Sequence, residues 1–119
     1  MANVKFRLNI TSSTTVSDRL DFSVEKALEV TKPYGALARL NVTHTAASVI
    51  QGTGNPDCML YVKNLDPTNF IKVTNDAGVI VAKVVPNMFV LIGVPAAAGI
   101  KFQANVATCE VEYGFWSIP

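Results

Sequence analysis

Histidine, tryptophan and charge are scarce in this sequence. It has one histidine, one tryptophan and two cysteines in 119 residues, and only 16% of its residues are charged. Catalytic sites draw on histidine, cysteine or paired carboxylates, so the small supply of these groups argues against an enzyme. Half of the residues are hydrophobic, which is the opposite of the composition that keeps a chain disordered. The chain is therefore expected to fold as one domain, residues 1–119.

A concentrated charge of either sign is also missing. Ten Lys and Arg residues and nine Asp and Glu residues are spread along the chain, and the formal net charge is +1. Nucleic-acid binding needs a basic patch that neutralises phosphates, so no nucleic-acid partner is expected. No apolar run approaches the roughly 18 residues that span a bilayer. Met1–Thr15 lacks the continuous apolar stretch of a signal peptide. We therefore expect a soluble protein, made in a cytoplasm, that does not contact a membrane.

The residues that could bind a metal or act as nucleophiles do not form a motif. Cys58 and Cys109 have no metal-site spacing, and His44 is the one other soft ligand, so no zinc site is expected. We predict two buried free thiols, and a disulfide only if the two strands that carry them are neighbours. His44 is predicted to be solvent-facing or structural, because a catalytic role would need Ser48 and Asp57 to reach it by coincidence of folding. No enzymatic activity, cofactor or metal is expected.

Apolar and polar residues alternate with a period of two through almost the whole chain. The alternation is clear at Val4–Ile10, Leu20–Val24 and Cys58–Val62. Turn residues recur about every 8–12 positions, and the helical periodicity of a mixed α/β fold is not visible. The pattern predicts an all-β fold, an antiparallel two-sheet β-sandwich of about ten short strands. A jelly roll and an immunoglobulin-like arrangement both remain open.

Strand register has to be inferred from the apolar face of each segment. Ser23–Val30 fits two short strands better than a short helix. Cys58–Val73 is predicted to form a hairpin around the turn Asn64–Thr68. A slip of one residue would reverse the face of a whole strand. The predicted core consists of Phe6, Leu8, Leu40, Val42, Leu60, Val62, Ile80, Ala82, Phe89, Leu91, Phe102 and Val111.

The C-terminal segment Phe115–Pro119 is a candidate for a protein interface. Phe115 and Trp116 are consecutive, so on a strand their side chains point to opposite faces. One can enter the core while the other faces outward. Trp116 then either lies under a loop or anchors in a neighbouring subunit. The polar segment that follows the first strand is the second candidate. The residues predicted at an interface are Phe115, Trp116, Ile118, Thr14 and Thr15.

Three segments of the second half resemble a pattern found in small virion proteins of tailed bacteriophages. Residues 61–71 read YVKNLDPTNFI, residues 82–91 read AKVVPNMFVL, and residues 100–113 read IKFQANVATCEVEY. In that family a KN-x-D-x-T-N hairpin precedes a P-x-x-F strand and a closing A-N-x-A-x-C-x-V-E-Y strand. The resemblance covers half of the chain, and the usual P-G-E turn is Pro86-Asn87-Met88 here.

The resemblance implies a virion structural protein. The function expected first is that of a capsid decoration, or cement, protein on the capsid surface. Such a protein binds the major capsid protein or other virion proteins and is homo-oligomeric, with a trimer favoured. A tail, neck or baseplate component is the alternative within the virion. A carbohydrate-binding sandwich is a further alternative, and it would need coplanar exposed aromatics or a calcium cluster.

Overall fold

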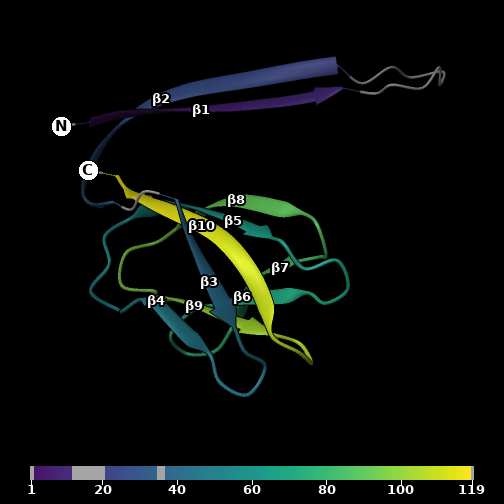
Figure 1. Cartoon of the computed structure of the whole chain (residues 1–119). Helices are drawn as coiled ribbons and strands as arrows, with labels where there is room; N and C mark the ends of the chain where they lie inside the picture. Colours follow the sequence, from purple (N-terminus) through teal and green to yellow (C-terminus); the bar gives the residue numbers. More distant parts are fainter. Residues whose placement is uncertain (1, 12–20, 35–36, 119) are drawn as a thin grey trace.

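The computed structural model describes residues 2–11, 21–34 and 37–118, with the backbone alone at 2–3, 21–22, 28 and 30–34. The described residues form ten strands and no helix, so the all-β prediction is confirmed (Figure 1). The strands are β1 (Ala2–Thr11), β2 (Asp21–Tyr34), β3 (Ala38–Val42), β4 (Ser48–Gln51), β5 (Cys58–Asn64), β6 (Ile71–Thr74), β7 (Ile80–Val84), β8 (Phe89–Val94), β9 (Ile100–Ala104) and β10 (Cys109–Ser117).

Strands β3 to β10 pair in a nested pattern. β3 pairs with β10, β4 with β9, β5 with β8, and β6 with β7, all antiparallel. Successive pairs lie in alternate sheets. Sheet 1 has the order β3-β10-β5-β8, and sheet 2 has the order β4-β9-β6-β7. A long antiparallel ribbon rolled into two layers has this connectivity, which is that of a jelly roll. The strand order thus selects the jelly roll over the immunoglobulin-like arrangement.

The core fills the space between the two sheets. In β5 and β9 every second residue is buried, as expected for strands with one face on a core. Phe102 is fully buried and packs edge-on against Tyr113, with ring centroids 5.6 Å apart. Cys58 and Cys109 are buried free thiols, which confirms the prediction for both. The other largest fully buried side chains are Leu60, Ile71, Ile100, Val42, Val62, Val73, Val84, Val111 and Asn64.

The predicted core is wrong for strand β8. Phe89 and Leu91 are 53% and 41% exposed, on the outer face of sheet 1. The residues of β8 that pack on the core are instead Val90, Ile92 and Val94. Both faces of this strand are apolar, so the alternation of apolar and polar residues does not show which face is buried. The predicted inward-facing positions are therefore one residue away from the observed ones. Of the other predicted core residues, Leu8 and Ile80 are also exposed.

The hairpin predicted over Cys58–Val73 is also wrong, because β5 and β6 lie in different sheets. β6 instead forms a hairpin with β7 in sheet 2. Asn64, fully buried, holds the crossing segment between the sheets. Its Nδ2 donates to the carbonyl oxygens of Asn69 at 2.7 Å and of Val84 at 3.1 Å. Its Oδ1 accepts a hydrogen bond from the Asp66 amide at 2.9 Å.

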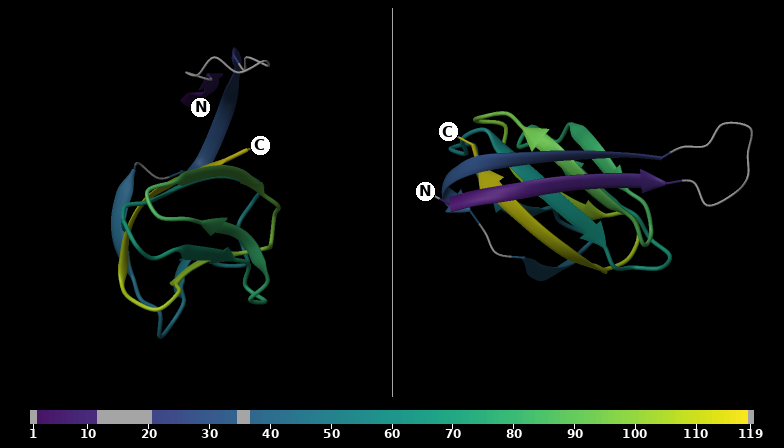
Figure 2. Two further views of the ribbon diagram at one scale, coloured as in Figure 1. Left: turned by 90° about the vertical axis from the view of Figure 1, so that its right-hand side faces the viewer. Right: turned by 90° about the horizontal axis from the view of Figure 1, so that it is seen from above.

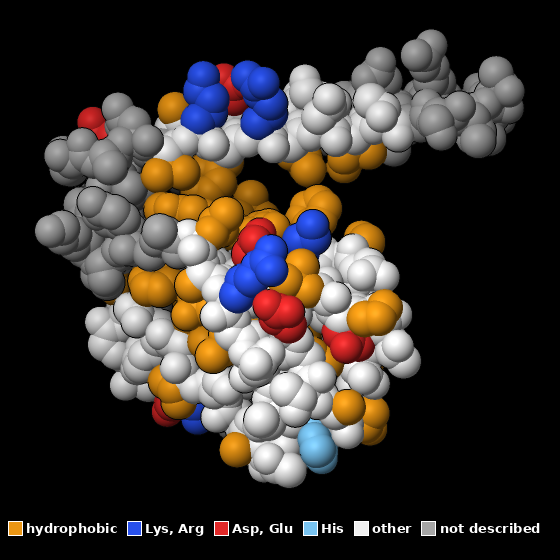
Figure 3. Space-filling model, in the orientation of Figure 1, with side chains coloured by type: hydrophobic (Ala, Val, Ile, Leu, Met, Phe, Trp, Pro, Cys, Tyr) orange, Lys and Arg blue, Asp and Glu red, His pale blue; other side chains and the backbone are white. Residues whose placement is uncertain are grey.

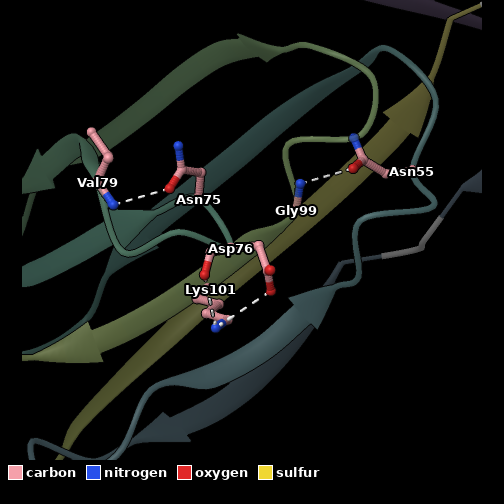
Figure 4. A network of polar contacts seen from close by, with 6 residues as sticks. All are labelled: Asn55, Asn75, Asp76, Val79, Gly99 and Lys101. Atoms are coloured by element: carbon pink, nitrogen blue, oxygen red, sulfur yellow. Dashed lines mark hydrogen bonds and ion pairs between the residues drawn. The ribbon is translucent and has the colours of Figure 1, made fainter.

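At the other end of the sandwich, a second asparagine joins two loops (Figure 4). Asn55 is 4% exposed, and its Oδ1 accepts a hydrogen bond from the Gly99 amide at 2.9 Å. Its Nδ2 donates to the carbonyl oxygen of Pro95 at 3.1 Å. Gly99 has a φ of 77°, and a Cβ there would lie 3.1 Å from the Cβ of Asp76, so this position requires glycine. The loops before β5 and before β9 are therefore fixed together.

Strands β1 and β2 form a long antiparallel pair, here called the arm, that lies above sheet 1 (Figures 1 and 2). Ten residue pairs run in register from Ala2 opposite Val30 to Thr11 opposite Asp21. The end of β2 continues into sheet 1, where Tyr34 lies opposite Trp116 of β10. The two short strands predicted over Ser23–Val30 are wrong, because β2 is one continuous strand of 14 residues.

Candidate interaction surface

The described groups that could do chemistry have structural contacts. His44 is exposed, and its carbonyl oxygen accepts a hydrogen bond from Gln103 Nε2 at 3.0 Å. Asp57 Oδ1 accepts one from the Ala96 amide at 2.7 Å. Burial raises the pKa of the Cys58 thiol, and the carboxylate of Asp57 adds to the effect, so little reactive thiolate forms. Residues 2–11, 21–34 and 37–118 hold no group of three His, Cys, Asp or Glu side chains suited to a metal ion.

The described part of the chain has no helix of the length and hydropathy needed to cross a membrane.

The arm has one charged face and one apolar face. Because β1 and β2 are antiparallel and in register, residues opposite one another share a face. Arg7 lies opposite Glu25, and Lys5 lies on the same side. The carboxylate of Glu25 forms ion pairs with both cations. Its oxygens lie 2.8 Å from the Arg7 guanidinium and 3.1 Å from the Lys5 ammonium. These exposed ion pairs add little stability, but they mark the face that stays in water. Figure 3 shows these charges on the side of the arm that points away from the sandwich.

The apolar face of the arm points toward the sandwich. Leu8 lies opposite Val24 on this face, and Phe6 lies opposite Lys26, the one charged residue among the paired positions of this face. Figure 3 shows hydrophobic side chains along the underside of the arm and on the sheet below it. Leu8 and Val24 nevertheless remain 43% and 56% exposed. The arm therefore carries an apolar face that its own sandwich covers only in part.

Trp116 joins the arm to sheet 1. Its ring meets that of Phe6 edge-on, with centroids 5.6 Å apart. Gly114, two residues earlier on the same face of β10, makes room for the indole. A Cβ on Gly114 would lie 3.1 Å from the ring of Trp116 and 3.2 Å from Leu37. The close approach of Trp116 to the sheet thus depends on the missing side chain at position 114.

Beyond this joint, the arm and sheet 1 enclose an open groove of about 330 Å³. Leu8 and Arg7 of β1 line one side, and Tyr61, Val90 and Leu91 with Phe89 line the other. Burial raises the pKa of Tyr61, and the nearby carboxylate of Glu112 raises it further. The phenol is therefore a neutral donor at physiological pH and adds no charge. The groove is mainly apolar.

A second apolar surface runs along the side of the sandwich formed by the edge strands β7 and β8. Of the twelve large hydrophobic residues that are exposed among those described, seven fall in residues 79–91. We call these seven the rim: Val79, Ile80, Val81, Val85, Met88, Phe89 and Leu91. The one charged residue in this stretch is Lys83, whose ammonium lies 4.3 Å from the centre of the Phe70 ring. The rim is an almost uncharged apolar surface.

The rim begins at a fixed turn and borders a cavity. Asn75 Oδ1 accepts a hydrogen bond from the Val79 amide at 2.9 Å, and Asp76 lies 3.5 Å from the ammonium of Lys101 (Figure 4). Next to this turn, β7 and β8 border a cavity of about 250 Å³ lined by apolar residues of both sheets, Ile92 among them. The sandwich is therefore not fully closed along this side. β7 and β8 are also sheet edges, which leave backbone groups free to pair with another strand.

The structure places the predicted interface residues in different settings. Phe115 packs against the core and Trp116 against the arm. Ile118 is half-buried, and its amide donates to the carbonyl oxygen of Asp57 at 2.8 Å. Thr14 and Thr15 lie outside the described residues. A partner contact at any of these positions stays a prediction.

The rim was not identified from the sequence. Its signal is present, however, since residues 79–91 contain one charge in thirteen residues and are apolar at successive positions. A strand with one face in water alternates, whereas this stretch does not. Such a run is the sequence pattern of a strand with both faces covered.

No family model, curated protein or solved structure matches the chain.

Proposed function

We propose that the chain is a non-catalytic structural subunit of a larger protein assembly, and that this assembly is a tailed-bacteriophage virion on which it serves as a capsid decoration protein. The observation that carries the proposal is the rim: seven exposed large hydrophobic residues in and next to the edge strands β7 and β8, with one charge that is already in contact with an aromatic ring. Exposed apolar patches of this kind mark interaction surfaces.

The setting in a virion comes from the sequence resemblance of residues 61–113, together with the jelly-roll strand order. Jelly rolls occur in viral capsid proteins, but also in lectins and cupins, so the fold alone does not decide the function. A carbohydrate-binding role needs a platform of exposed aromatics. Among the residues whose side chains are described, Phe89 is the one aromatic that is a large exposed hydrophobic side chain. Tail, neck and baseplate positions remain alternatives within the virion.

Sedimentation with virus particles tests the proposal. Virions of the encoding phage that lack this chain are mixed with the purified protein and separated from free protein on a density gradient. We expect the protein to co-sediment at a fixed number of copies per particle and cryo-EM to show it on the outer capsid. Density at the tail or baseplate would move it to the alternative position. Absence from the particles at every concentration would refute a virion role.

A further inference from the structure

We infer that the chain associates with a second copy of itself, head to tail, with the apolar face of the arm of one copy on the β7–β8 rim of the next. This inference rests on the proposed function and names the surfaces involved. The arm and the rim are different parts of the chain, so each copy offers one of each. A contact between unlike surfaces gives a ring when the rotation closes and a filament when it does not.

The rim has the chemistry of a buried interface. With about half of each side chain accessible, its seven residues expose on the order of 600 Å² of apolar surface, the upper end of the range for a monomer. One partner in a specific interface contributes roughly 800 Å². Lys83 is the one charged residue of this stretch, and its ammonium lies over the Phe70 ring, 4.3 Å from the ring centre. The cavity beside Ile92 gives an incoming apolar side chain a place to enter.

The arm is the partner on the same chain that suits this surface. It is a strand pair whose apolar face is exposed at Leu8 and Val24. Lys5, Arg7 and Glu25 lie on the opposite face. Lys26 lies on this face, opposite Phe6 and nearer the joint with sheet 1, so a contact confined to Leu8 and Val24 need not bury its ammonium. Within the chain, Leu8 already faces Phe89 and Leu91 of the rim across the open groove. Contact with a neighbouring rim would complete an apolar contact that one copy leaves unfilled.

A contact between two rims is the competing arrangement. It would cover Val79 and Ile80 in both copies, but Leu8 and Val24 would stay in water. The head-to-tail arrangement takes Leu8 and Val24 of one copy out of water together with the rim of the next copy. The two arrangements predict different behaviour when only the arm is changed.

Three matched Val→Asp variants separate the two arrangements. Val24→Asp changes the arm, Val79→Asp changes the rim, and Val106→Asp is the control at an exposed valine in neither surface. The full chain and its variants are analysed by sedimentation velocity and mass photometry, with circular dichroism to check the fold. Leu8→Asp and Ile80→Asp repeat the test if a first variant does not fold.

We expect the wild type to form oligomers at micromolar concentration. Val24→Asp and Val79→Asp should each weaken association at least about 30-fold, because a carboxylate is then buried without a partner. The control should stay within about twofold of the wild type. An equimolar mixture of the arm and rim variants should give two-copy complexes, since one intact arm and one intact rim can still meet.

Three results would overturn the inference. They are a monomeric wild type, undiminished association of Val24→Asp, and a mixture of folded variants that stays monomeric. The samples in this experiment contain only this chain and its variants, and no other protein. Failure of this test is therefore distinct from failure of the proposed virion role, which the sedimentation with particles tests separately.

Discussion

Phe6 and Trp116 lie 110 residues apart in the sequence, and their rings meet edge-on with centroids 5.6 Å apart. This contact places the arm over sheet 1 and turns its apolar face toward the sandwich. Because the chain has one tryptophan, the indole also reports optically on this joint alone.

Removal of either ring should loosen the arm without unfolding the sandwich. Phe6→Ala and Trp116→Ala are compared with the double variant by urea unfolding. Edge-to-face aromatic pairs contribute about 0.5–1.5 kcal/mol beyond the area they bury, so we expect a coupling energy in that range. Limited proteolysis should cut the arm faster in each single variant. Strictly additive effects of the two substitutions would show that the rings do not interact in solution.

Gly114→Ala should displace the indole from the sheet. The new Cβ would lie 3.1 Å from the Trp116 ring and 3.2 Å from Leu37. We expect a loss of about 1–3 kcal/mol in the free energy of unfolding and a red shift of the tryptophan emission. Gly52→Ala is the control, because nothing lies within 4 Å of its Cβ position. Equal emission spectra for the two variants would contradict the packing of the Trp116 indole against Gly114.

Asn64→Ala should destabilise the sandwich more than Asn75→Ala does. The Asn64 amide group makes three hydrogen bonds in a fully buried position, and alanine removes all three. We expect a cost of about 2–4 kcal/mol in the free energy of unfolding. Asn75→Ala removes one exposed hydrogen bond and should cost less than about 1 kcal/mol. Thermal or chemical unfolding of both variants makes the comparison, and equal costs would count against a special role for Asn64.

Asp66 should contribute to stability at neutral pH and lose that contribution in acid. Its carboxylate accepts hydrogen bonds from the amides of Asn69 and Thr68, which lower its pKa in the folded protein. A carboxylate whose pKa is lower in the folded than in the unfolded protein stabilises the fold at pH values above its pKa in the unfolded chain, which is about 4 for aspartate. This stabilisation is lost as the pH falls through the pKa of the folded protein.

The Asp66→Asn variant tests this pH dependence. It should be less stable than the wild type at pH 7, and the difference should shrink as pH is lowered from 4 to 2 during denaturant titrations at each pH. A difference that stays constant over that range would mean that the carboxylate charge is not the cause.

The sequence predicts the fold class well because alternation is a local signal, and the strands of sheet 1 such as β5 and β10 show it clearly. It does not predict the face of β8, because Phe89–Val94 is apolar at both parities. It also misplaces the partner of β5. The turn after Asn64 resembles that of a hairpin, whereas the buried amide of Asn64 instead directs the chain into the other sheet.

The sequence predicts the position of the interaction surface less well than it predicts the fold. Thr14, Thr15 and the C-terminal aromatics stand out by composition, but Phe115 and Trp116 pack within the chain. The rim depends on β7 and β8 being sheet edges that lie side by side, and only the three-dimensional strand order shows this. A run such as Val79–Val81 looks like buried core until its strand is found to have no neighbour on one side.

The central claim is that the chain functions by association through the arm and the rim. Hydrogen–deuterium exchange of the full chain, compared at concentrations below and above its association, tests this most directly. We expect slower exchange of backbone amides in β7, β8 and β1 on association, with no change in the loop at Asn55, which is already fixed within the chain. Unchanged exchange in β7 and β1, with protection elsewhere or nowhere, would contradict it.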